Sequence, residues 1–141
     1  MAILFNIEKN VKINIKLIEN YMLDIEINRN DFENYIPFDL CVETPLNKIS
    51  LNREIPTFTL YELKNLITKT RKIIENKKDE DSYEYFSSEA FFNFKIEYLK
   101  EDDIVEIDFW INTSYIGDER LFGFDYGVKF CSNIEQVFIF L

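Results

Sequence analysis

Apolar residues recur at every second position in two segments, 92–98 and 105–111, which are separated by a short charged stretch. A period of two places these residues on one face of a β-strand, so the segments predict an antiparallel hairpin. A two-residue loop at Glu101-Asp102 would form four apolar pairs: Phe92 with Ile111, Phe94 with Phe109, Ile96 with Ile107, and Tyr98 with Val105. A slip of one residue would turn every apolar side chain to solvent, so this register is well determined.

The same register gathers charged residues on the opposite face of the hairpin. Glu97 lies opposite Glu106, and like charges that are directly opposed destabilise a sheet. Asp108 has Lys95 opposite it, and the only tryptophan of the chain, Trp110, lies beside this pair. Under-compensated carboxylates next to an aromatic plane are typical of a face that receives cationic side chains. The alternative is that a helix covers Trp110 and that the carboxylates only rim the sheet.

The negative charge of the chain is concentrated in its second half. The net charge is −10, of which residues 1–78 carry +1 and residues 79–141 carry −11. This balance argues against DNA or RNA as a ligand, and on charge alone an acidic surface that serves only solubility is the favoured interpretation. Together with the face of the hairpin, the charge is compatible with a basic protein partner. The residues predicted to bind the partner are Glu97, Asp102, Asp103, Glu106, Asp108, Trp110, Asp118 and Glu119.

The composition disfavours catalysis. Histidine, the commonest general base and metal ligand, is absent, and three glycines form no phosphate-binding loop. Cys41 and Cys131 have no metal-like spacing, so we expect two reduced thiols, no metal and no cofactor. The apolar runs are too short to cross a bilayer and residues 1–10 do not resemble a secretory signal, so a cytoplasmic protein is expected.

One segment changes to the helical period. Thr59 and Glu62 have the spacing of a capping box, and Phe58 and Leu63 have the spacing of a hydrophobic staple. A helix is therefore predicted over residues 59–76. Its apolar stripe consists of Leu63, Leu66, Ile67, Thr70, Ile73 and Ile74.

The remaining segments predict strands around this helix. Before the helix, alternation or apolar character predicts strands over 11–18, 21–28, 36–43 and 47–52, the first two as a hairpin and the third with Pro37 at a strand start or edge. The polar segment 75–89 is predicted as a loop, and strands are expected over 121–130 and 136–141 after the hairpin. The whole chain, 1–141, is thus predicted as one α+β domain: a twisted antiparallel sheet or sandwich of about eight strands with one main helix.

The order of these segments resembles the WapI-type immunity proteins of bacterial polymorphic toxin systems. The resemblance begins near residue 21 and is carried by "FDLCVE", "IPTFTLYELKNLI", "EAFFNFKIEYL", "IVEIDFWIN" and "FGFDYGVKF…IEQVFIFL". Where that family tends to have a tryptophan before the helix, this chain has Phe38-Asp39-Leu40. The resemblance implies a small cytoplasmic inhibitor that neutralises a nuclease toxin, typically a cationic protein.

Three functions remain open from the sequence. The first is an immunity protein that masks a basic toxin. The second is a phage-encoded inhibitor whose acidic face imitates the phosphates of a nucleic acid and blocks a nucleic-acid-binding defence protein. The third is an enzyme that uses paired carboxylates, with Glu97 and Glu106 or Asp108 at its centre, which would require a concave pocket.

Overall fold

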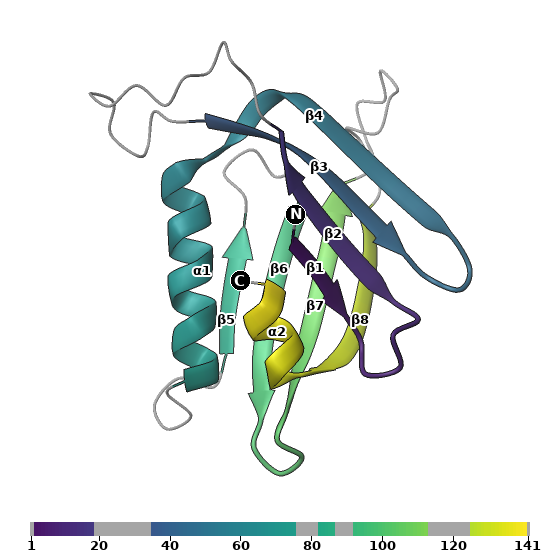
Figure 1. Cartoon of the computed structure of the whole chain (residues 1–141), viewed down its shortest axis with the longest axis vertical. Coiled ribbons are helices and arrows are strands. Elements are labelled where there is room, and N and C mark those ends of the chain that lie inside the picture. The colour runs from purple at the N-terminus through teal and green to yellow at the C-terminus, as the bar shows by residue number, and fades with distance from the viewer. Residues whose placement is uncertain (1, 19–34, 76–81, 87–91, 113–124, 141) are drawn as a thin grey trace.

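Two antiparallel sheets of four strands pack against each other in the computed structural model, which describes residues 2–18, 35–75, 82–86, 92–112 and 125–140 (Figure 1). The first sheet has the order β1-β2-β3-β4, formed by Ala2–Phe5, Lys12–Leu17, Tyr35–Glu43 and Lys48–Thr59. The second sheet has the order β5-β6-β7-β8, formed by Ser82–Phe86, Phe92–Leu99, Ile104–Asn112 and Asp125–Asn133. This arrangement confirms the predicted α+β class and the antiparallel sandwich.

The core lies between the two sheets and is rich in aromatic rings. Phe92 stands at its centre: its ring centroid is 6.0 Å from that of Phe38 on the first sheet and 5.5 Å from those of Tyr85 and Phe109 on the second. The alternating side chains that the sequence assigned to the inner face of β6 and β7 are all buried. The other face of the second sheet is therefore left pointing away from the core.

The helix α1 (Leu60–Glu75) begins where the capping box predicts. Oε2 of Glu62 accepts hydrogen bonds of 2.9 Å from the backbone N–H and the hydroxyl of Thr59, and the Glu62 N–H donates to Thr59 Oγ1 at 3.1 Å. The predicted stripe faces the core, with Leu66, Ile73 and Ile74 buried. The helix stands beside β5 and contacts β4, β5 and β6 (Figure 1), so it leaves the outer face of the second sheet uncovered.

At the opposite side of the molecule, β8 is joined to β1. The fully buried hydroxyl of Ser132 donates a 2.6 Å hydrogen bond to the carbonyl oxygen of Phe5, and the N–H of Ile7 donates to the carbonyl of Cys131 at 3.0 Å. The second helix, α2 (Ile134–Phe140), follows β8 directly and packs against β1, with Val137 fully buried. The strand predicted over 136–141 is therefore wrong, because a short apolar run carries no period that separates a strand from a helix.

Two strands were not predicted. β5 lies within the segment predicted as a loop, where Tyr83 and Tyr85 point inward and alternate with polar residues, but the charged flanks hide this short pattern. β1 has only four residues and no visible alternation. The predicted strand over 21–28 lies outside the described residues, and β2 pairs with β1 and β3.

The strands around Pro37 also differ from the prediction. β4 extends over twelve residues instead of the six expected over 47–52. β3 lies between β2 and β4, and the ladder of β3 and β4 shifts register between Ile36 and Phe38, so Pro37 marks an irregularity within an interior strand. A proline cannot donate to the ladder, which explains the shift at this position.

In the part of the chain that the structure describes, neither helix is long and apolar enough to cross a membrane.

Candidate functional site

The outer face of the second sheet, directed away from the core, carries the candidate site; we name it the acidic face. Its side chains lie in rows that run across β5, β6, β7 and β8, as the cross-strand register gives them. The three rows are Ser82-Glu97-Glu106-Cys131, Glu84-Lys95-Asp108-Lys129 and Phe86-Asn93-Trp110-Gly127, and Asp125 follows opposite Asn112. The face thus holds five carboxylates and two lysines, for a net charge of −3.

The carboxylates on this face are better compensated than the hairpin alone predicts. Lys129 Nζ lies 2.6 Å from Glu106 Oε1 and 3.7 Å from Asp108 Oδ1, and Lys95 Nζ lies 3.2 Å from Glu97 Oε2. The hydrogen bond with Glu106 is the main reason that the pKa of Lys129 is raised. β8 therefore supplies a cation that the β6–β7 register does not contain, although the carboxylates of the face still outnumber its lysines.

Trp110 lies open on the acidic face, with 45% of its surface exposed. The alternative that a helix covers it is therefore wrong. Its indole ring lies over Gly127 on the neighbouring strand: a Cβ atom added to Gly127 would stand 2.6 Å from Cζ3 of Trp110 and closer still to Cε3 and Cδ2. Glycine at this position lets the indole rest on the backbone, which fixes the ring and leaves its remaining surface to solvent.

Two shallow hollows meet at Trp110. The larger has a volume of about 280 Å³ and is lined by Glu84, Asn93, Lys95, Asp108, Trp110 and Asp125. The smaller, of about 190 Å³, is lined by Phe86, Phe92, Asn93, Trp110, Asn112 and Asp125. Asp108 lines the larger hollow, but its Oδ1 atom is buried from solvent and has no hydrogen-bond donor among the described residues; the Lys129 ammonium is 3.7 Å away.

The predicted binding residues divide into three groups. Glu97, Glu106, Asp108 and Trp110 come together on the acidic face. Asp102 and Asp103 lie in the turn after β6, about 20 Å from Trp110 at the usual rise of a strand. Asp118 and Glu119 lie outside the described residues.

The turn itself differs from the predicted two-residue loop. It comprises four residues, 100–103, between the last pair of the ladder, and Asp103 adopts a positive φ of 55°. The hydroxyl of the buried Tyr98 donates a 2.6 Å hydrogen bond to Oδ1 of Asp103. Asp103 therefore stabilises the turn from the core side and is not part of the acidic face.

Seven residues that line the hollows were not among the predicted binding residues: Glu84, Phe86, Phe92, Asn93, Lys95, Asn112 and Asp125. The first two belong to β5, and the alternation in "SYEYF" is the signal that would have placed them outward. Asp125 does lie at an outward position of the segment predicted as a strand, but only the β7–β8 register brings it next to Trp110.

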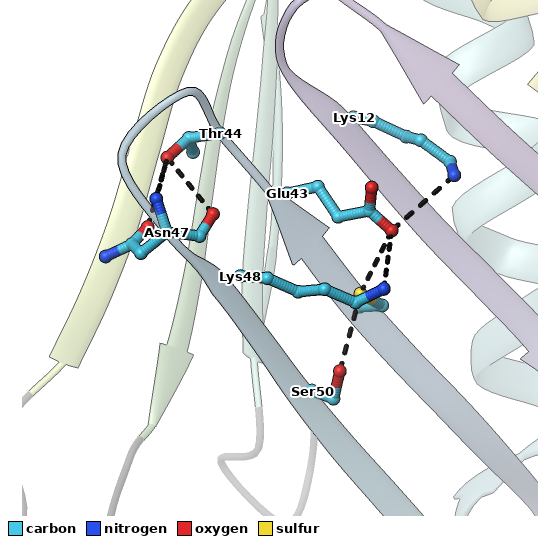
Figure 2. Close-up of polar contacts among 7 residues, drawn as sticks. Lys12, Glu43, Thr44, Asn47, Lys48 and Ser50 are labelled. Atoms are coloured by element: carbon cyan, nitrogen blue, oxygen red, sulfur yellow. Dashed lines mark hydrogen bonds and ion pairs between the residues drawn. The ribbon is translucent and has the colours of Figure 1, made fainter.

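The outer face of the first sheet has a different electrostatic character. Figure 2 shows the carboxylate of Glu43 between Lys48, at 3.0 Å, and Lys12, at 3.6 Å. The hydrogen bond from Lys48 is the main cause that lowers the pKa of Glu43. The neighbouring Cys41 thiol lies 3.4 Å from the Ser50 hydroxyl and 3.7 Å from Glu43. Charges on this face pair among themselves, which points to a structural role.

Cys41 and Cys131 are both free, as expected. They lie on outward positions of different sheets, on opposite sides of the core, so they cannot act as a redox pair within one molecule. Among the described residues, no group of three or more cysteine, aspartate or glutamate side chains is arranged to hold a metal ion.

Comparison of the chain with protein-family models, with curated proteins and with solved structures gave no match. The functional argument therefore rests on the geometry and charge of the acidic face.

Proposed function

We propose that the protein is a non-catalytic inhibitor that binds a basic protein through its acidic face, and specifically that it is an immunity protein that neutralises a cationic nuclease-type toxin. The observation that carries this proposal is the position of Trp110: a half-exposed indole, seated on Gly127, among the carboxylates of an open sheet. The immunity role itself comes from the resemblance in the order of sequence elements.

An aromatic residue of this kind suits an interface anchor. Tryptophan is enriched at the energetic centres of protein interfaces, where it buries a large area at low cost in conformational entropy. Trp110 already rests on the backbone of β8, so little rotameric freedom remains to be lost on binding. Phe86, 61% exposed, stands in the same row and extends the apolar part of this surface.

The charge of the face suits a basic partner. A net charge of −3 surrounds the aromatic pair, within a half of the chain that carries −11. The negative electrostatic potential of this surface accelerates encounter with a cationic protein and makes association sensitive to salt. In the proposed role the inhibitor acts in the cytoplasm, where a nuclease toxin reaches nucleic acid.

The pattern of lysines argues against the two other functions. Lys95 and Lys129 alternate with Glu84 and Asp108 across the second row, whereas a mimic of nucleic acid needs a continuous series of negative charges. Lys129 also holds Glu106 and Asp108 in ion pairs, so the carboxylates at the centre of the proposed enzyme site are already engaged by a cation of the same sheet. Alternating charges suit a protein partner with a matching pattern.

The test is affinity capture in the native host with three versions of the tagged protein: wild type, Trp110→Ala and Glu43→Gln. We expect the wild type and Glu43→Gln to retain a basic protein that elutes at high salt, and Trp110→Ala to lose it. The purified partner should degrade nucleic acid, and addition of the wild-type protein should abolish that activity. If Trp110→Ala retained the partner, the proposed binding face would be wrong. If the partner had no nuclease activity, the proposed immunity role would be wrong.

A further inference from the structure

We propose that the larger hollow beside Trp110 is a receptor site for one arginine side chain of the basic partner. This inference rests on the proposed function and makes it specific: it states which cation the acidic face recognises and where. The hollow combines an aromatic plane with carboxylates contributed by three different strands, Glu84 from β5, Asp108 from β7 and Asp125 from β8.

The aromatic wall favours a planar cation. One side of the Trp110 indole is occupied by Gly127, and the exposed part of the ring borders the hollow. A guanidinium group stacks on such a ring through both cation–π attraction and flat contact, which a compact ammonium group does not provide. The apolar stem of an arginine can at the same time lie against the surface near Phe86.

The carboxylate of Asp108 supplies a charged hydrogen-bond acceptor at the wall of the hollow. Its side chain is 21% exposed, and the Lys129 ammonium lies 3.7 Å from its Oδ1 atom while it bonds to Glu106 at 2.6 Å, so Lys129 engages Asp108 only loosely. Hydrogen bonds to an ionised acceptor are stronger than those between neutral groups, so a cationic donor that reaches the exposed part of this carboxylate contributes to binding. A guanidinium offers five N–H donors in a fixed plane, enough to reach Asp108 while another edge faces Asp125 or Asn93.

The size of the hollow fits a single side chain. Its volume of about 280 Å³ is below the usual range for sites that enclose a whole small molecule. The lining already contains one ammonium group, that of Lys95, which repels a second cation unless that cation is also stabilised by stacking and by directed hydrogen bonds. Both requirements favour arginine over lysine.

The experiment uses the single tryptophan as a reporter, because its fluorescence depends on the surroundings of the Trp110 indole, which borders this hollow. The full chain is titrated at low ionic strength with two blocked peptides of equal length and charge, hexa-arginine and hexa-lysine. We expect a saturable change in Trp110 fluorescence with hexa-arginine and roughly fivefold weaker binding of hexa-lysine. Asp108→Asn should remove most of this preference, whereas Glu43→Gln, on the other sheet, should keep it.

Melting curves of each variant establish that it is folded. Asp125→Asn, at an exposed edge of the hollow, is a second substitution that should also reduce the preference for hexa-arginine over hexa-lysine. Equal binding of both peptides, with Asp108→Asn weakening both equally, would overturn the arginine site while leaving a general cation-binding face. No fluorescence change with either peptide would also overturn it. Neither result decides the proposed inhibition of a nuclease, which the capture experiment tests separately.

Discussion

The hydroxyl of Tyr85 donates a 3.1 Å hydrogen bond to Oε1 of Glu62, whose other carboxylate oxygen closes the capping box of α1 with Thr59. One carboxylate thus starts the helix and ties it to β5, at the edge of the second sheet. Burial, followed by the proximity of Glu62, raises the pKa of Tyr85 well above its ordinary value. The position of β5, and with it of Glu84 and Phe86 on the acidic face, depends on this link.

Tyr85→Phe should lower the free energy of unfolding by about 1 kcal/mol, because it removes the hydrogen bond and leaves the ring in place. Tyr83→Phe is the matched control, since Tyr83 is on the same strand and face but makes no such bond; its effect should stay below about 0.5 kcal/mol. Urea denaturation of both variants measures the difference. Equal effects would show that the link to α1 is not stabilising.

The same group predicts a loss of stability at alkaline pH. The ordinary tyrosine pKa is about 10, so above that pH the unfolded chain releases the Tyr85 proton while the folded protein retains it. The unfolded state then binds fewer protons, and the free energy of unfolding falls as pH rises. Denaturation from about pH 8 to pH 11 should show a steeper decline for the wild type than for Tyr85→Phe. Parallel declines would refute this assignment.

Gly127→Ala should destabilise the protein by about 1–3 kcal/mol, because the new methyl group meets the Trp110 ring. In a Trp110→Ala background the same change should be neutral or slightly stabilising, since alanine restricts the unfolded chain more than glycine does. A double-mutant cycle by chemical denaturation gives the coupling between the two positions. A coupling of about zero would mean that the indole does not rest on Gly127 in solution.

Lys129→Met should tighten binding of hexa-arginine, because it frees Glu106 and Asp108 from their ion pairs. The expected gain is at most roughly fivefold, the effect of one unit charge at about 4 Å in water, and it should shrink as salt is added. Lys12→Met, on the first sheet, is the control for the change in net charge and should have little effect. A loss of affinity in Lys129→Met would assign this lysine to partner recognition instead.

Leu66→Ala and Phe94→Ala should each destabilise the fold by about 2–5 kcal/mol, since both side chains are buried between helix and sheets. Leu46→Ala is the control, because Leu46 is 94% exposed in the turn between β3 and β4 and should change stability by less than about 0.5 kcal/mol. Denaturation midpoints compare the three. A small loss at Phe94 would contradict the β6–β7 register.

The elements that the sequence predicts well are those with a local cause. The β6–β7 register follows from four apolar pairs across a short turn, and the start of α1 follows from the Thr59 and Glu62 pair; both are confirmed. Four predicted site residues on the hairpin accordingly lie on one face. Nothing in these inferences depends on a distant part of the chain.

The features that escaped prediction depend on non-local pairing. β8 joins the sheet after a connection of twelve residues, 113–124, so the sequence does not reveal its register. Both the compensation of Glu106 by Lys129 and the seat of Trp110 on Gly127 follow from that register alone. The short apolar run in α2 likewise packs against β1, a contact that the local sequence does not reveal.

The junction between β1 and β8 has a consequence for how the chain reaches its native state. The hydrogen bond from Ser132 to the carbonyl of Phe5 joins residues 127 positions apart, and α2 covers the same strand. During synthesis β1 leaves the ribosome well before the residues of β8 and α2 that complete its environment. Contacts of such long sequence separation form slowly, because the entropy of closing a large loop is lost before they stabilise the chain. β1 can pair with β2 across a short turn, whereas we expect its contacts with β8 and α2 to form late, and the apolar side of the first sheet to need protection from aggregation until they do.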